Sequence, residues 1–194
     1  VQAAGGNTSM KSSGSMLIKA SGAWLVNSNL EEIFVEVNLS SIKNKINLEI
    51  DDNFSKDIIS KNDLRPSIET SFHALIDFKY VLHVHSTSTI ANAISLNSEM
   101  RLKEIIKKDF IYVPYVRPGF PLTMMIKKKL NIKNQIFILE NHGLIVAGND
   151  LQQTYDLLLD IHQKLDTVRN SQSDITSQNS EIIIENYSLK NDEK

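Results

Sequence analysis

Apolar and polar positions alternate over short runs in the first part of this chain, which is the pattern of half-buried β-strands. Such runs at residues 15–20, 24–27 and 33–37 predict three strands separated by Gly and Asn turns. A short turn or helix is expected to start at residues 38–41, whereas the polar stretch 44–62 has weak periodicity and predicts a connection. The front of the chain is therefore expected to be a β-meander.

Helical and strand-like patterns alternate over the remaining chain. Ser67 is a favourable N-cap residue followed by apolar positions at helical spacing, so a helix is predicted to begin there, with Glu69 in its first turn. The further predicted elements are a strand at 79–84, helices at 89–95 and 99–107, a strand at 110–113, a helix at 122–130, strands at 135–139 and 143–147, and a helix at 150–168.

The domain organisation follows from where these patterns stop. Residues 1–168 are expected to form one domain, and residues 169–194 a polar C-terminal extension in which 181–187 could add a last strand. The chain starts at Val1 without methionine, almost directly before a Gly-rich motif, so we expect a leading segment to be missing. No internal repeat is found.

Composition narrows the class of protein. With 194 residues, of which 41% are hydrophobic and 23% charged, the chain suits a single globular domain. A net charge of -2 gives no field that would attract nucleic acid or an anionic membrane. No run approaches the roughly 20 apolar residues of a membrane span, and no signal segment opens the chain, so a cytoplasmic protein is expected. Because there is no cysteine, any transition-metal site must be built from His, Asp and Glu.

Three histidines have the spacing of a metal site. His83 and His85 project from the same face of a predicted strand, with Val84 turned away, so both imidazoles can reach one ion. His142 lies between a predicted strand and Gly143, at a turn where the backbone can approach closely. Three nitrogen donors leave one coordination position open, which fits a catalytic Zn²⁺ site better than a closed structural one.

Other interpretations of these residues stay open. The two histidines in one strand are a common chance pattern, and all three could be unrelated core or surface residues. A Schiff-base enzyme would instead use a lysine such as Lys19 or Lys79, which would need a desolvated amine with a depressed pKa. His73, four residues after Glu69, could orient that carboxylate, but a buried core histidine is the favoured interpretation and we leave it out of the site.

Five short motifs together carry a family resemblance. They are residues 5–9 (GGNTS), 19–22 (KASG), 65–69 (RPSIE), 83–86 (HVHS) and 141–143 (NHG). In order and approximate spacing they resemble the class II aldolase/adducin family, over about residues 4–168. The resemblance implies an α/β fold of three layers, with a central, mainly antiparallel sheet flanked by helices. It also implies a homotetramer whose active sites lie at subunit boundaries.

The resemblance also assigns roles to individual residues. It makes three histidines the metal ligands, Glu69 the acid/base, and four neutral residues the binding site of a substrate phosphate. The ligands are His83, His85 and His142, and the phosphate-binding residues are Asn7, Ser21, Gly22 and Ser67. Many phosphate-binding members have a second Ser where this chain has Ile68, which offers only its backbone N–H.

The expected function is that of a metal-dependent class II aldolase, a lyase acting on a ketose phosphate or a related sugar. Zn²⁺ or another divalent ion would neutralise the enediolate left by carbon–carbon cleavage, and Glu69 would move the proton. For that purpose Glu69 would need a raised pKa or a metal-linked change of protonation. A sugar-phosphate epimerase or dehydratase with the same histidines is the nearest alternative. A non-catalytic adducin-like binding module is another, although it would not need all four metal-site residues. The sugar itself stays open.

Overall fold

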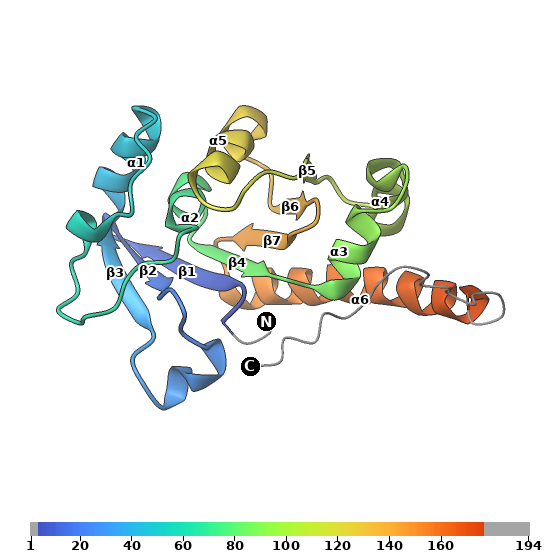
Figure 1. Ribbon diagram of the computed structural model, residues 1–194, viewed down its shortest axis with the longest axis horizontal. Helices are drawn as coiled ribbons and strands as arrows, with labels where there is room; N and C mark the ends of the chain where they lie inside the picture. Colours follow the sequence, from blue (N-terminus) through green and yellow to red (C-terminus); the bar gives the residue numbers. More distant parts are fainter. Residues whose placement is uncertain (1–3, 177–194) are drawn as a thin grey trace, which may run out of the picture.

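The computed structural model describes residues 4–176, and the side chains of residues 4–166. Seven strands form one sheet in the order β3-β2-β1-β4-β7-β6-β5, with every pair antiparallel except β5 and β6 (Figure 1). The strands are β1 (Asn7–Ser12), β2 (Ser15–Lys19), β3 (Phe34–Asn38), β4 (Tyr80–Val84), β5 (Ile111–Val113), β6 (Ile136–Leu139) and β7 (Gly143–Gly148).

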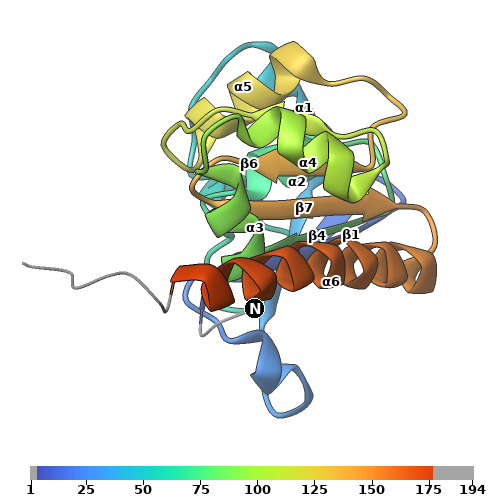
Figure 2. The same ribbon diagram turned by 90° about the vertical axis from the view of Figure 1, so that its right-hand side faces the viewer.

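Helices cover both faces of the sheet (Figures 1 and 2). The helices are α1 (Leu39–Asn47), α2 (Thr70–Leu75), α3 (Thr87–Ala93), α4 (Ser98–Ile106), α5 (Phe120–Lys129) and α6 (Leu151–Thr176), with 3-10 turns η1 (Leu25–Asn29) and η2 (Ser55–Asp57). Alternate residues of β7 show the two layers, because Ile145 packs with α2 and α5, whereas Leu144 packs with α3, α4 and α6. The expected three-layer fold with a mainly antiparallel sheet is confirmed.

Strand β1, which the hydrophobic pattern did not predict, lies near the middle of the sheet. Its inward-facing residues are polar, since Asn7, Ser9 and Lys11 are all buried. An inward face of this kind lacks the apolar alternation by which strands are recognised. The register with β4 places Asn7 opposite His83 and Ser9 opposite Val81, so β1 presents polar groups to α2.

Three other predictions differ from the structure. The strand expected at residues 24–27 is the 3-10 turn η1, which buries none of its residues and so has no sheet partner. The connection expected at 44–62 contains the end of α1 and the short turn η2. The chain beyond residue 168 continues α6 to Thr176, because no Gly or Pro stops the helix there. The strand proposed at 181–187 lies outside the described residues.

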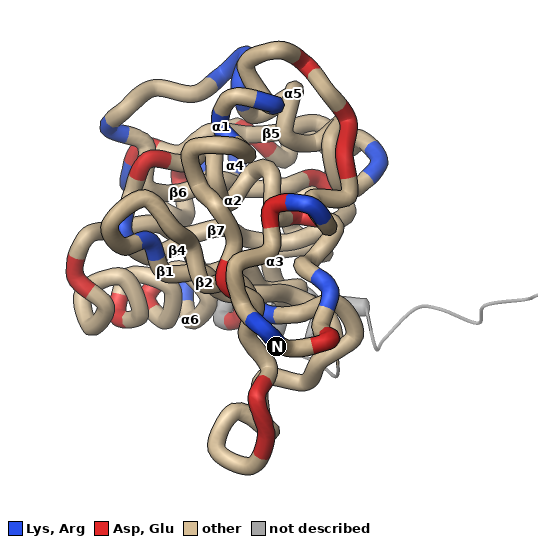
Figure 3. Tube along the Cα trace, turned by 90° about the vertical axis from the view of Figure 1, so that its left-hand side faces the viewer, with Lys and Arg blue, Asp and Glu red and all other residues tan. Residues whose placement is uncertain are grey.

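The surface carries both signs of charge. Lys and Arg are interspersed with Asp and Glu over the side of the molecule drawn in Figure 3. Among the helices that the structure describes, none is both long enough and apolar enough to cross a membrane.

Candidate metal centre

The three predicted histidines and Glu69 converge at one point of the sheet. Each of the four residues offers a ligand atom, and these atoms all lie within 4.8 Å of one another. Nε2 of His83 is 3.1 Å from Nε2 of His85 and 3.5 Å from Oε2 of Glu69. Nε2 of His142 is 3.2 Å from Oε1 of Glu69. This is the cluster that the sequence pattern predicted, with its carboxylate included.

The antiparallel pairing of β4 and β7 brings the histidines together. His83 faces the same side of β4 as Val81, toward α2, and His85 follows two residues later. The register places Val84 opposite Leu144, so the turn before β7 carries His142 beside the end of β4. Gly143 allows this approach, because a Cβ at that position would lie 2.3 Å from the carbonyl oxygen of Val84.

Glu69 enters the cluster from the turn before α2. The helix begins at Thr70 with Glu69 in the N-cap position, two residues later than the predicted cap at Ser67. Ser67 forms a side-chain turn instead, in which its Oγ accepts a hydrogen bond of 3.2 Å from the backbone N–H of Glu69. Its carbonyl oxygen accepts a bond of 2.6 Å from Thr70 Oγ1. These two hydrogen bonds fix the positions of Ser67 and Glu69 beside the cluster.

Burial favours the neutral form of two of the histidines, in which an imidazole nitrogen can bind a metal. Nδ1 of His83 lies 3.1 Å from the carbonyl oxygen of Leu144 and donates to it, which leaves the lone pair of Nε2 facing the cluster. Burial lowers the pKa of His83 to about 4, against the opposing effect of Glu69. Burial also lowers the pKa of His85. Two neutral imidazoles and a third histidine packed this closely around a carboxylate suit a divalent cation.

Glu69 is ionised at neutral pH. Burial by itself would raise its pKa, but electrostatic attraction to the neighbouring His83 and His142, together with the hydrogen bond from Asn7, outweighs burial and lowers the pKa to about 2. The raised pKa considered from the sequence is therefore not found. A carboxylate in this state can contact a cation or accept a hydrogen bond.

A cavity of about 230 Å³ opens beside the cluster. It is lined by all four residues predicted to bind a substrate, together with Lys19 and two of the histidines. The four are Asn7, Ser21, Gly22 and Ser67. An adjoining cavity of about 260 Å³ shares Ser21, Ser67 and Ile68 with it and adds Arg65.

Two basic residues beside the cavity were not part of the predicted site. Arg65 directly precedes Pro66 in the RPSIE motif, and its carbonyl oxygen accepts a bond of 2.9 Å from the N–H of Ser21. In the sequence, only its place in the RPSIE motif indicated that Arg65 could lie near the site. Lys19 is buried, and its Nζ donates to the carbonyl oxygens of Ala23 at 2.6 Å and Ala4 at 3.2 Å.

The two lysines considered for Schiff-base chemistry differ in environment. Lys79 is exposed and has no desolvated amine. Burial lowers the pKa of Lys19, while Glu69 opposes that shift. The carbonyl oxygens around its Nζ accept hydrogen bonds and so favour the ammonium form, which is not nucleophilic.

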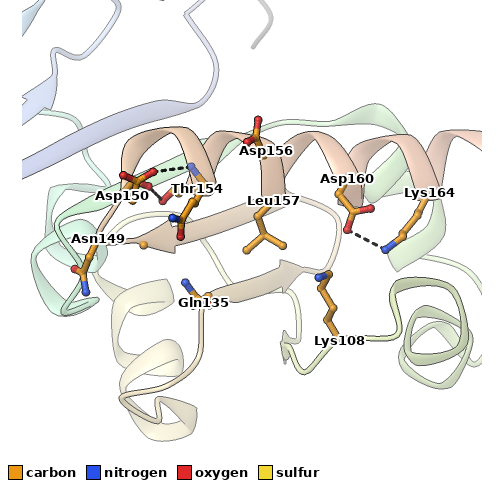
Figure 4. A pocket seen from close by; sticks show the side chains of 11 residues that line it. Lys108, Gln135, Asn149, Asp150, Thr154, Asp156, Leu157, Asp160 and Lys164 are labelled. Atoms are coloured by element: carbon orange, nitrogen blue, oxygen red, sulfur yellow. Dashed lines mark hydrogen bonds and ion pairs between the residues drawn. The ribbon is translucent and has the colours of Figure 1, made fainter.

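A larger cavity, of about 600 Å³, lies at the opposite end of β7 (Figure 4). Two of its acidic side chains have partners within the lining, since Asp160 pairs with Lys164 at 2.9 Å and Asp150 accepts a bond of 2.8 Å from the N–H of Gln153. None of the four clustered donors lines it. The smaller cavity is therefore the candidate site.

With this fold and this cluster, the chain belongs to the class II aldolase and adducin family. The family described as Class II Aldolase and Adducin N-terminal domain matches residues 1–167. Among solved structures, the N-terminal class II aldolase domain of a conserved protein from Thermoplasma acidophilum superposes with a TM-score of 0.76. It has 20% sequence identity, and the match covers 85% of this chain and 84% of that one.

Two curated relatives carry different names. The uncharacterized oxidoreductase YuxG of Bacillus subtilis is 31% identical over 183 residues, which are 86% of this chain and 26% of that protein. The 3-oxo-tetronate 4-phosphate decarboxylase of Haemophilus influenzae is 30% identical over 107 residues, which are 47% of this chain and 50% of that protein. The chain thus spans about a quarter and about half of these relatives, and membership of the family does not by itself assign a reaction.

Proposed function

We propose that this chain is a metal-dependent lyase that cleaves a carbon–carbon bond in a ketose phosphate or a related sugar, as class II aldolases do. The observation that carries the proposal is the convergence of His83, His85, His142 and Glu69 within 4.8 Å, beside a cavity lined by neutral hydrogen-bond donors. A module that only binds a partner protein has no need of such a donor set.

The proposed roles follow from the chemistry of the donors. The three histidines would hold Zn²⁺ or another divalent ion, which when bound supplies positive charge for the substrate oxygens that become negative as the bond breaks. Glu69, being ionised, can take the proton from the carbon that becomes the nucleophile in the direction of bond formation. In the cleavage direction it returns that proton to the same carbon.

An anionic group of the substrate would bind in the same cavity, beside Ser21, Gly22 and Ser67. Ser21 and Ser67 offer side-chain hydroxyls and Gly22 offers its backbone N–H. The amide N–H groups of Asn7 already bond Ser67 and Glu69, so Asn7 would act by holding Ser67. Ile68 supplies no hydroxyl, and its side chain is 68% exposed. Arg65 in the adjoining cavity would add the positive charge that these neutral donors lack.

Decarboxylation of a phosphorylated 3-oxo acid is a second candidate, favoured by the relative from Haemophilus influenzae. Loss of carbon dioxide from a carbon beside a ketone leaves the same kind of enediolate as aldol cleavage, so the same donor set would serve both reactions. From the family we also propose a homo-oligomer, a tetramer by resemblance, and a cytoplasmic location.

Metal analysis tests the proposal first. Protein purified without added zinc, and again after reconstitution, is compared with His83→Ala and His142→Ala. His162→Ala is the matched control, because His162 bonds Ser86 outside the cluster. We expect about one divalent ion per chain in the native protein and the control, and none in the two ligand variants. Absence of metal from the native protein even after reconstitution would overturn the proposal.

Product analysis then separates the two reactions. Aldehyde released from ketose 1-phosphates would identify an aldolase, whereas carbon dioxide released from a 3-oxo acid phosphate would identify a decarboxylase. Borohydride in the presence of substrate would trap a covalent adduct only if a lysine such as Lys19 were the nucleophile. We expect no adduct, and activity lost on chelation.

A further inference from the structure

A chain of buried hydrogen bonds leads from the interior of the sheet to the candidate site. His73 of α2 is fully buried, and its Nδ1 lies 2.7 Å from Oγ of Ser9 on β1. Its Nε2 contacts Oδ1 of Asn7. The amide nitrogen of Asn7 in turn lies 2.7 Å from Oε2 of Glu69 and 3.1 Å from Oγ of Ser67. These hydrogen bonds connect His73, which has no assigned role, to Glu69 of the metal cluster and to Ser67 of the substrate cavity.

The direction of each hydrogen bond in this chain is fixed by chemistry. The amide oxygen of Asn7 can only accept, so Nε2 of His73 carries the proton and donates it. Nδ1 of the neutral ring then accepts from the hydroxyl of Ser9. Exchanging the amide oxygen and nitrogen of Asn7 would place its oxygen against the Glu69 carboxylate, where two acceptors repel.

The consequence reaches the substrate cavity through Ser67. Oγ of Ser67 accepts one hydrogen bond from Asn7 and another of 3.2 Å from the N–H of Glu69. With both lone pairs occupied, its own hydroxyl hydrogen remains available to a group in the cavity that Ser67 lines. Ser67 is thereby restricted to the role of a donor, which suits an anion.

We propose that His73 is a positioning residue. By bonding the amide oxygen of Asn7, His73 directs one amide N–H of Asn7 to Glu69 and the other to Ser67. Ser67 thereby becomes a dedicated donor to an anionic ligand. The ring is itself held in place, because it stacks on Phe72 with a centroid distance of 4.6 Å and an interplanar angle of 22°. The part that concerns the ligand rests on the proposed function. The part that concerns the hydrogen bonds does not.

The tautomer of His73 can be measured without metal or ligand. Long-range ¹⁵N–¹H correlation spectra of the full chain report which ring nitrogen carries the proton. We expect a neutral ring protonated at Nε2, and an Asn7→Leu variant that alters the resonances of this ring. A ring protonated at Nδ1 in the native protein would overturn the proposal.

Ligand binding is tested with inorganic phosphate, by calorimetry on zinc-reconstituted protein. His73→Phe keeps a planar ring but cannot donate to Asn7, and we expect it to weaken phosphate binding about tenfold. His73→Gln has an amide N–H for Asn7 and an oxygen for Ser9, and is expected to restore affinity to within about threefold. In an Asn7→Leu background, the further change His73→Phe should have no additional effect.

The control must separate positioning from a general loss of stability. Asn92→Leu is suitable, because Asn92 is also buried and donates to the carbonyl oxygens of Ser88 and Leu165, which lie outside the site. Phosphate binding that is weakened equally by His73→Phe and Asn92→Leu would overturn the proposal. If the native protein binds neither zinc nor phosphate, the proposed function fails, and the ring tautomer alone decides for or against the role of His73.

Discussion

Substituting Gly143 by alanine should separate β4 and β7 at the end where the candidate metal ligands lie. The added Cβ would lie 2.3 Å from the carbonyl oxygen of Val84 and 3.2 Å from Cα of His85. Both atoms belong to backbone, so neither can rotate away, and the strands must move apart by about 1 Å to restore ordinary contact. The glycine also has a φ of +154°, which side chains disfavour.

The expected loss of stability combines these two effects. Overpacking of a well-packed interior costs about 1–3 kcal/mol, and an unfavourable φ costs about 1–2 kcal/mol more. A total of about 3 kcal/mol corresponds to a fall in Tm of about 6–12 °C for a domain of this size. Because the displaced backbone carries His85 and His142, zinc affinity should also fall, by about tenfold or more.

Thermal unfolding of the metal-free protein, followed by circular dichroism, measures the stability, and competition with a chelator measures zinc affinity. Gly14→Ala is the matched control, because Gly14 has a φ of +88° but nothing within 4 Å of the added Cβ. The free energy of unfolding of Gly14→Ala should be lower by about 1 kcal/mol, and its zinc affinity should be unchanged. A Gly143→Ala variant that is no less stable than Gly14→Ala, with unchanged zinc affinity, would refute the reasoning.

Three further predictions concern stability. Burial and the charge of Lys43 lower the pKa of Lys11 to about 7, so between that pH and its ordinary pKa of 10.5 the unfolded chain binds more protons than the folded one. The free energy of unfolding should therefore rise with pH in this range, by at most about 1.4 kcal/mol per unit, relative to a Lys11→Met variant measured by urea unfolding; parallel pH profiles would contradict this. Asp57→Ala should lower the free energy of unfolding by about 2 kcal/mol, since the buried carboxylate accepts bonds of 2.6 Å from both Ser41 and Lys45. An unchanged midpoint of urea unfolding would show that these bonds contribute nothing to stability. Zinc at about a hundred times its Kd should stabilise the native protein by about 2.7 kcal/mol in thermal scans and leave a variant without its histidine ligands unaffected, whereas an equal rise in both would point to binding elsewhere.

The sequence predicted the cluster of three histidines and Glu69 better than the rest of the candidate site. His83 sits in an apolar strand and His85 directly follows that strand, so the alternation predicts a common face, and His142 adjoins a glycine that marks a turn. Glu69 came from its motif, and the structure places it with them. These predictions depend on local geometry, which a sequence pattern represents well.

The anion-binding part of the candidate site depends on contacts between residues far apart in the sequence, which no local pattern predicts. Strand β1 escaped prediction because Asn7 and Ser9 face inward, where a strand ordinarily places apolar side chains. Their partners on α2 are distant in sequence, so the polar residues looked like a loop. The place of Arg65 beside Ser21 likewise depends on a contact between two loops.

The separation in sequence of the paired residues has a consequence for folding. The bond between Asn7 and Ser67 joins residues 60 positions apart, and that between Asn7 and Glu69 spans 62. Closing loops of this length is slow and yields little until the sheet is nearly complete. A fragment carrying β4 and β7 alone would therefore lack the anion-binding half, and ligand affinity becomes a measure of whether the whole sheet has assembled.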